Sequence, residues 1–234
     1  MSTIKANDKS RNASLDKLIR TMLTDAFVSV QPLPQCPHIS LYLVDPSTMD
    51  RPFTLDEIRR IWDHTAYWAF CWASGQVLAR FILDNPHWGK GKKVLDFGAG
   101  SGVVAIAAMK AGAKHVIACD IDPQALISCQ QNAELNQVKL TLSDDLFAIK
   151  DDDIDLLIAA DVLYDRANLS FLDTFFKYAP QVLLADSRIK NFQHHHYQAL
   201  EKIASFTVPD LDEFDEFRLV SLYEGRAEQA TTVN

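Results

Sequence analysis

The sequence predicts an α/β fold: a Rossmann-like, mainly parallel sheet of seven strands with helices on both faces, an antiparallel final strand and a small N-terminal extension. Short apolar runs alternate with helical segments from Lys93 onward, which is typical of a parallel sheet. A glycine-rich turn joins the first of these runs to its helix. The last two apolar runs have no clear long helix between them, which indicates an antiparallel end.

Length and composition favour one globular domain. The chain has 234 residues, of which 48% are hydrophobic and 23% charged, enough for a substantial core. We expect an N-terminal extension over residues 1–60, the main domain over 61–225 and a disordered tail over 226–234.

Charge and cysteine content limit the partners and the compartment. Lys and Arg number 23 against 31 Asp and Glu, and this net charge of −8 argues against a nucleic-acid partner. The four cysteines form no C-x-x-C pair, so we expect neither a disulfide framework nor structural zinc. The polar N-terminus lacks an apolar segment, so we expect a cytoplasmic protein with no membrane partner.

Before the glycine-rich turn, the extension and the start of the main domain contain mixed elements. We expect a helix over 15–23, strands over 27–30 and 39–44 flanking a proline cluster, a helix opened by the capping box of Thr54 and Glu57, and a helix over 76–83. The segment from Tyr67 to Gln76 is rich in large rings. Core packing explains such rings, and a wall of a binding site for a flat base or a cation is the alternative.

The turn from Asp96 to Gly102 discriminates between cofactors. A dinucleotide fingerprint needs Gly or Ala at position 103, where this chain has Val103, and it leaves Gly102 unexplained. The pattern of Asp96, Gly98, Gly100 and Gly102 instead is similar to motif I of the class I S-adenosylmethionine-dependent methyltransferases.

Carboxylates follow the next two expected strands. Asp120 ends the strand over 115–120, where a carboxylate can accept hydrogen bonds from both ribose hydroxyls, and Asp122 is the alternative. Pro123 is well placed to start a helix that reaches position 136. Asp144 follows the strand over 140–143 and is a candidate partner for the adenine amine, with Leu146 packing on the ring; a solvated turn is the alternative.

The strand over 155–161 is nearly continuously apolar and therefore buried on both faces. Asp161 and Tyr164 follow it, at the sheet edge where open α/β sheets bind ligands, so they are the leading candidates for receiving substrate. Further along we expect an amphipathic helix around 169–176, a strand over 181–186, a helix to about 204, and strands over 206–208 and 218–223. His194, His195 and His196 would point in different directions on that helix, so we expect no metal site.

These segments together resemble the seven-strand methyltransferases of the family-16 type, and within them most the electron-transfer-flavoprotein beta-subunit lysine methyltransferases. The resemblance rests on the aromatic stretch 67–86, on motif I, on 120–123 and on the acidic-x-x-aromatic motif of Asp161 and Tyr164. It implies S-adenosylmethionine as cofactor. The residues expected to contact it are Trp72, Asp96, Gly98, Gly100, Gly102, Asp120, Ile121, Asp144, Leu146 and Asp161.

The resemblance implies catalytic roles for Asp161 and Tyr164, and methyl transfer to lysine side chains of a protein, with the electron-transfer flavoprotein beta subunit as one candidate. Two departures lie on the substrate side: Ala73-Ser74 replaces the Pro-Gly of the family's Trp-Pro-Gly-Gly, and Leu163 replaces Phe. A small-molecule N-methyltransferase is the main alternative. A non-catalytic binding protein and an NAD-dependent oxidoreductase are further alternatives, the last disfavoured by Val103.

Overall fold

The computed structural model describes residues 11–150, 153–190 and 192–227. The tail predicted from Arg226 onward lies outside these residues from position 228, and Arg226 itself ends a strand. Within the described part of the chain, no helix is long and apolar enough to cross a membrane.

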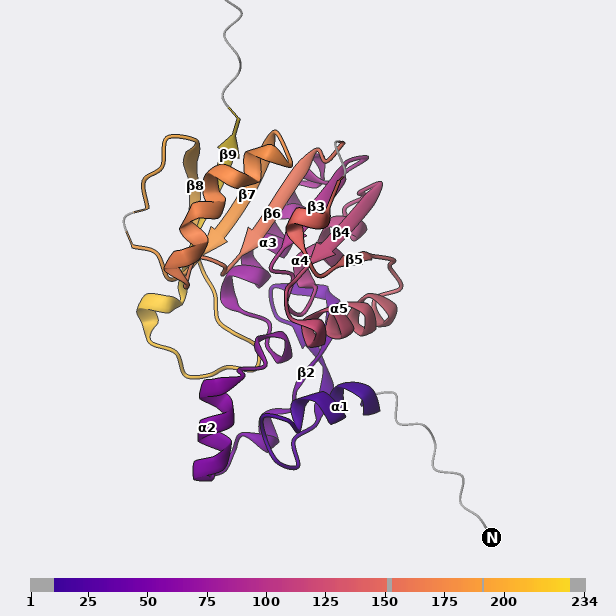
Figure 1. Ribbon diagram of the computed structural model, residues 1–234, viewed down its shortest axis with the longest axis vertical. Helices are drawn as coiled ribbons and strands as arrows, with labels where there is room; N and C mark the ends of the chain where they lie inside the picture. The colour runs from indigo at the N-terminus through magenta and orange to yellow at the C-terminus, as the bar shows by residue number, and fades with distance from the viewer. Residues whose placement is uncertain (1–10, 151–152, 191, 228–234) are drawn as a thin grey trace, which may run out of the picture.

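A seven-stranded sheet forms the centre of the molecule (Figure 1), as the sequence predicted. Its strands are β3 (Lys93–Phe97), β4 (His115–Cys119), β5 (Thr141–Ser143), β6 (Leu156–Ala160), β7 (Gln181–Asp186), β8 (Tyr197–Ala204) and β9 (Leu219–Arg226). They lie in the order β5-β4-β3-β6-β7-β9-β8. All pairs from β5 to β7 are parallel, and β9 runs antiparallel to both β7 and β8. The predicted mainly parallel sheet with an antiparallel final strand is therefore confirmed.

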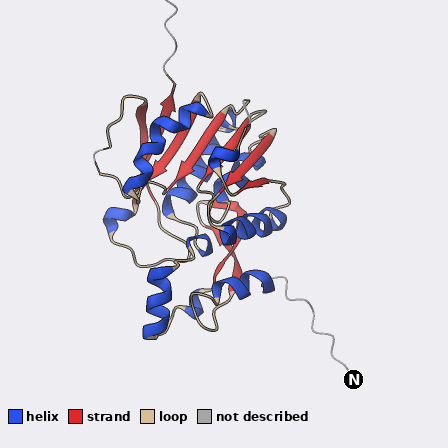
Figure 2. Cartoon of the chain, viewed as in Figure 1, coloured by secondary structure: helices blue, strands red, loops and turns tan. Residues whose placement is uncertain are grey.

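Helical segments cover both faces of the sheet (Figure 2). The α-helices of the main domain are α3 (Ala73–Asp84), α4 (Val103–Lys110), α5 (Pro123–Leu135) and α6 (Phe171–Thr174). The short 3₁₀ helices are η1 (Pro46–Thr48), η2 (Tyr67–Ala69), η3 (Pro86–Trp88), η4 (Leu146–Ala148), η5 (Arg166–Ser170), η6 (Phe175–Lys177) and η7 (Asp215–Phe217). Alternate residues of β6 enter separate cores: Leu156 and Ile158 join the apolar residues of α3 and α4, whereas Leu157 joins those of α6 and η6. This explains the continuous apolar run of the strand.

The N-terminal extension consists of α1 (Ala13–Ile19), the antiparallel hairpin of β1 (Val28–Leu33) and β2 (Cys36–Val44), and α2 (Leu55–Asp63). The predicted capping box at the start of α2 is present. Asn132 of α5 and Asn136, which caps the end of this helix, hold the hairpin. The Asn132 side chain accepts the backbone N–H of Tyr42 at 2.7 Å, and Asn136 bonds both backbone polar groups of Ser40. The extension is thus bonded to the helix that follows β4.

The prediction for the region after β7 is wrong in one element. We expected a helix to about residue 204 and a strand over 206–208, but residues 197–204 form β8, and Val208 makes only an isolated bridge with Cys71. The Ala, Leu, Glu and Lys of this segment are good helix formers, and most of its side chains are exposed, so no apolar alternation marks a strand. Pairing with β9 overrides that local preference. The helix expected around 169–176 is also broken, into η5, the single turn of α6 and η6.

Candidate functional site

The candidate residues gather at the carboxyl ends of β3, β4, β6 and β7. Asp96 lies in β3, Asp120 directly follows β4, Asp161 directly follows β6, and Ser187 directly follows β7. Because parallel strands end at one edge of the sheet, this topology brings residues from distant parts of the chain together. Figure 1 shows the arrowheads of β6 and β7 directed toward the side of the molecule where α2 lies.

The glycine turn is shaped by left-handed backbone conformations. Gly98, Gly100 and Gly102 have φ values of +69°, +52° and +80°. A Cβ at Gly98 would lie 2.7 Å from Cγ1 of Val162, and a Cβ at Gly102 would lie 3.1 Å from Sγ of Cys129. Side chains at these positions would be strained and would collide with the neighbouring elements, so the turn presents backbone to whatever binds it.

Asp96 supports this turn from the interior. Its carboxylate accepts the backbone N–H of Ala105 in the first turn of α4 at 2.9 Å, and only 2% of the residue is exposed. Burial raises its pKa to about 8, and the nearby Asp120 adds to the rise. Asp96 is therefore mostly protonated at neutral pH, and it joins the end of β3 to the start of α4.

Asp120 and Asp122 have separate roles in the structure. The carboxylate of Asp120 accepts the N–H of Gly100 at 2.8 Å and that of Asp122 at 3.0 Å. Burial raises the pKa of Asp120. Asp122 caps α5 by accepting the N–H of Gln124. Of the two carboxylates, Asp120 is thus the one that contacts the glycine turn.

Asp144 and Leu146, the residues predicted near an adenine ring, follow β5, and Ile121, a further predicted cofactor contact, follows β4. Asp144 is exposed, next to Asp145, which caps η4. Leu146 is 4% exposed and belongs to the core, whereas Ile121 is 86% exposed. Ile121 therefore offers accessible apolar surface, whereas Leu146 is buried in the core and offers almost none.

Asp161 connects three segments of the chain. Its carboxylate accepts the backbone N–H of Ser74 at 3.0 Å, the Ser74 hydroxyl at 2.5 Å, and the hydroxyl and N–H of Ser187 at 3.0 and 3.4 Å. Its backbone is left-handed, with φ +50°. Burial raises the pKa of Asp161 to about 6, while the hydrogen bonds from Ser74 oppose the rise. At neutral pH the group is mostly ionised and lies at the N-terminal turn of α3.

Three rings line the rim beside Asp161. The ring centroid of Tyr67 lies 5.5 Å from that of Tyr164 and 5.8 Å from that of Trp72. The indole N–H of Trp72 donates to the carbonyl oxygen of Tyr67 at 3.0 Å. Tyr164 and Tyr67 are 55% and 45% exposed, whereas Trp68 and Phe70 of the same stretch are core residues. The predicted core packing is confirmed for Trp68 and Phe70, and the role of the exposed rings as the wall of a binding site stays a prediction.

Sequence reasoning did not find Ser187, and it named Ser74 and Tyr67 only as members of the aromatic stretch, not as contacts of Asp161 and Tyr164. Each lies next to an element end: Ser74 in the first turn of α3, Ser187 just after β7, and Tyr67 at the start of η2. Position at a strand or helix end was the signal available for the serines, but their common partner becomes visible only in the folded chain.

The histidine run lies in the turn before β8, so the expectation that it is helical is wrong. One ligand atom each from Asp173, His194 and His195 lie within 4.8 Å of one another. Nε2 of His194 is 3.3 Å from Oδ1 of Asp173, so the two side chains can form an ion pair when His194 is protonated. The prediction of no metal stays a prediction.

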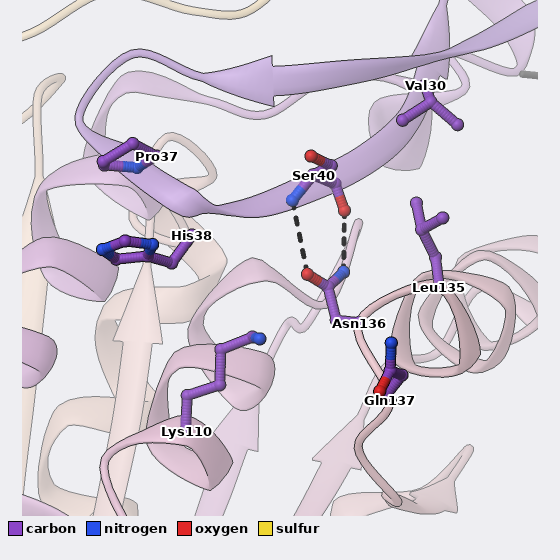
Figure 3. Close-up of a pocket in the computed structure, with 8 residues that line it drawn as sticks. All are labelled: Val30, Pro37, His38, Ser40, Lys110, Leu135, Asn136 and Gln137. Carbon is purple, nitrogen blue, oxygen red and sulfur yellow. Dashed lines mark hydrogen bonds between the residues drawn. The ribbon is translucent and has the colours of Figure 1, made fainter.

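One cavity lies away from these residues (Figure 3). It has a volume of about 380 Å³ and lies between the hairpin and the last residues of α4 and α5, with Lys110, Ser40 and Asn136 among its lining residues. Because the glycine turn precedes α4 and Lys110 ends it, the cavity is at the opposite end of that helix from the turn.

Comparison with known proteins finds sequences similar to this chain among methyltransferases. Residues 79–168 match the family model of the ribosomal protein L11 methyltransferases. The electron transfer flavoprotein beta subunit lysine methyltransferase of Danio rerio is 37% identical over 163 residues, 66% of this chain and 63% of the relative. That of Homo sapiens is 36% identical over 157 residues, 63% of this chain and 60% of the relative. The chain thus spans about three fifths of the length of these relatives.

Solved structures agree on the fold. The ribosomal protein L11 methylase from Lactobacillus delbrueckii subsp. bulgaricus superposes with a TM-score of 0.50 at 25% identity, over 66% of this chain and 79% of that one. The magnesium protoporphyrin IX methyltransferase from Synechocystis PCC 6803, solved with bound SAH, gives a TM-score of 0.51 at 15% identity, over 76% of this chain and 90% of that one.

Proposed function

The chain has the seven-strand methyltransferase fold and resembles the electron transfer flavoprotein beta subunit lysine methyltransferases, and on this premise we propose that it transfers a methyl group from S-adenosylmethionine to lysine side chains of a protein. The observation that carries the proposal is the contact between the two halves of the site. The turn that would hold the cofactor lies so close to Val162 that a Cβ at Gly98 would be 2.7 Å from its Cγ1, and Val162 directly follows Asp161, the residue proposed to bind the acceptor amine.

The residues present fit this cofactor. The left-handed glycines offer a backbone surface that any Cβ at Gly98 would disturb, and Asp120 holds a carboxylate beside Gly100 for the ribose hydroxyls. Asp144 and Ile121 would lie beside the adenine of the cofactor. Trp72 would contact the cofactor from the aromatic rim beside Asp161. Asp96 and Gly102 would shape the turn without lying against the cofactor, and Leu146 would act only as part of the core. When bound, the cofactor supplies an activated methyl group on a sulfonium.

Asp161 would receive the acceptor amine. Oδ2 of its carboxylate accepts only the N–H of Ser74, so it retains a lone pair for an N–H of lysine. Lysine must be neutral to react, which costs about 4–5 kcal/mol at neutral pH from an ordinary pKa near 10.4. A carboxylate alone would favour the charged ammonium. Four hydrogen bonds already share the charge of Asp161, which weakens this opposing effect.

Asp161 therefore orients the amine, and water removes its proton. Tyr164 shapes the slot, with Tyr67 beside it. Positioning of this kind can supply a large part of the acceleration of an in-line transfer.

The open rim favours a large acceptor over a small molecule. Tyr67 and Tyr164 are about half exposed, so an acceptor at Asp161 would remain in contact with solvent on one side. A lysine on a protein surface reaches such a site through its long side chain. The electron transfer flavoprotein beta subunit, named in the relatives, is the first acceptor that we propose.

The test uses methyl-labelled S-adenosylmethionine with a cell lysate and, separately, with purified electron transfer flavoprotein beta subunit. We expect label in a discrete protein band and, by mass spectrometry, on lysine. Label only in the small-molecule fraction would contradict the proposal and favour a metabolite N-methyltransferase. Cofactor binding without any label would favour the non-catalytic alternative.

A further inference from the structure

The helix α2 has its apolar face toward solvent. Leu55, Ile58 and Trp62 are 75%, 39% and 83% exposed. They are three and then four positions apart, so they form one continuous stripe along the helix. A surface helix normally turns such a stripe toward the core.

The opposite, polar face holds α2 against the protein. Glu57 is fully buried, forms an ion pair with Arg51 at 2.5 Å and accepts the backbone N–H of Thr24 at 2.9 Å. Hydrogen bonding with Arg51 holds the pKa of Glu57 well below its usual range. Arg60 donates to the carbonyl oxygen of Met22 and to the hydroxyl of Thr24. These contacts fix the rotation of α2, so the exposure of the stripe is built into the fold.

The helix that carries the stripe is close in the chain to the rim beside Asp161, where the acceptor would bind. α2 ends at Asp63, and the chain continues directly into Tyr67, whose ring lies 5.5 Å from that of Tyr164. A partner that covers the stripe is therefore in position to reach the rim beside Asp161.

An acidic segment reaches the same end. Val208 is bonded to Cys71, next to Trp72, and the residues that follow it include Asp210, Asp212, Glu213, Asp215 and Glu216. Among them Phe214 is 77% exposed. Figure 1 shows α2 and this C-terminal segment on the same side of the molecule, below the ends of β6 and β7. Asp210, Glu213 and Glu216 form ion pairs with Arg218, Arg188 and Lys190, so the excess negative charge of this segment comes from Asp212 and Asp215. The side around the rim thus combines apolar side chains with a small excess of negative charge.

We propose that the stripe of Leu55, Ile58 and Trp62 is the docking surface for the protein that carries the acceptor lysine. The occupant presents an apolar side chain to the stripe and basic residues to the acidic segment, in keeping with the net charge of −8 of this chain. The inference rests on the proposed function and adds to it how a folded acceptor is selected.

The test compares steady-state methylation of the purified electron transfer flavoprotein beta subunit with that of a short lysine peptide taken from it. The variants are Trp62→Ala and the double variant Leu55→Ser with Ile58→Ser, whose side chains are exposed enough to be shortened without loss of core packing. Leu200→Ser is the matched control, because Leu200 is also an exposed apolar residue, on β8.

We expect the KM for the intact protein to rise about tenfold or more in both stripe variants, because exposed Trp side chains are frequent centres of binding energy. The kcat, the rate on the peptide and the affinity for S-adenosylmethionine by calorimetry stay close to wild type. Leu200→Ser should match wild type in every parameter.

Three outcomes would overturn the proposal. An unchanged KM in the stripe variants, with an active wild type, refutes the docking surface and leaves the proposed function standing. A wild type that binds S-adenosylmethionine but methylates neither protein nor peptide refutes the proposed function, and the docking surface with it. A wild-type dimer that Trp62→Ala converts to monomers in analytical ultracentrifugation would assign the stripe to a second copy of this chain.

Discussion

The glycine turn and the segment around Asp161 meet at one edge of the sheet, yet they are built in different ways. The turn is held by buried polar groups: Asp96 bonds the start of α4, and Asn132 of α5, 31 positions along the chain, donates to the carbonyl oxygen of Ser101 at 2.9 Å. Asp161 is held by serines from α3 and from the loop after β7, and exposed rings surround it.

This difference assigns each region its own task. A turn fixed by buried polar groups is preorganised for one invariant ligand. A rim of exposed rings tied to distant segments can vary its specificity while the turn stays the same. If this is correct, changes at the turn should alter cofactor affinity, and changes at Asp161 should alter methyl transfer.

The largest effect is expected from Gly98→Ala. The new Cβ would lie 2.7 Å from Cγ1 of Val162 in a left-handed backbone with φ +69°, so the turn must move. We expect the affinity for S-adenosylmethionine, measured by calorimetry, to fall at least about 100-fold. Gly91→Ala is the matched control: φ is +74°, but nothing lies within 4 Å of its Cβ position. It should cost only about 1 kcal/mol of stability and leave affinity unchanged. Normal binding by Gly98→Ala would show that the turn does not hold the cofactor.

Asn132→Ala tests whether the N-terminal hairpin supports the turn. The variant leaves the N–H of Tyr42 and the carbonyl of Ser101 without this partner, which should lower the free energy of unfolding by about 2–3 kcal/mol. The affinity for S-adenosylmethionine should also fall, by about tenfold. Asn136→Ala is the control, because Asn136 bonds Ser40 of the same strand but not the turn (Figure 3). If both variants bind S-adenosylmethionine with equal affinity, the hairpin does not support the turn.

The pH profile of kcat/KM tests the ionisation of Asp161. The free lysine acceptor gives a slope of one in log rate against pH below its pKa of about 10.4. Protonation of Asp161, whose pKa burial raises to about 6, adds a second proton, so the slope should steepen to two below about pH 6. The profile of Asp161→Asn should keep a slope of one throughout. A wild-type slope of one at pH 5 would contradict the proposed role of the carboxylate.

Asp96 gives a smaller effect, on stability. Its folded-state pKa is raised to about 8 from 3.8, so the folded state binds the extra proton between these values. The free energy of unfolding should therefore fall as pH rises from 6 to 8, by about 1 kcal/mol per unit from this group. Asp96→Asn keeps an acceptor for Ala105 and should remove this part of the pH dependence in urea titrations at several pH values. An unchanged dependence would mean that Asp96 is ionised in the folded state.

The sequence predicted the fold well because the decisive signals are local. β6 and β7 lie where their apolar runs are, α5 starts at Pro123, and α2 has its capping box. β8 was missed because its side chains suit a helix and only its pairing with β9 makes it a strand.

The residues of the candidate site also differ in whether the sequence could reveal them. Asp96, Gly98 and Gly102 could be found because the turn is one continuous stretch of chain. Ser74 and Ser187 could not, because their contact with Asp161 spans 87 and 26 positions. The outward stripe of α2 was equally hidden: its periodicity is that of any amphipathic helix, and burial of Glu57 reverses which face points inward.

The most direct test of this account is a paired measurement on Asp120→Asn and Asp161→Asn, with calorimetry for S-adenosylmethionine and steady-state methylation of the acceptor protein. Asparagine keeps the size of each side chain and tolerates the left-handed backbone at position 161. We predict that Asp120→Asn weakens cofactor affinity about tenfold with little change in kcat at saturation. Asp161→Asn should lower kcat about 100-fold with cofactor affinity within twofold of wild type. Loss of the same parameter in both variants would contradict the division of the site into a cofactor turn and an acceptor end.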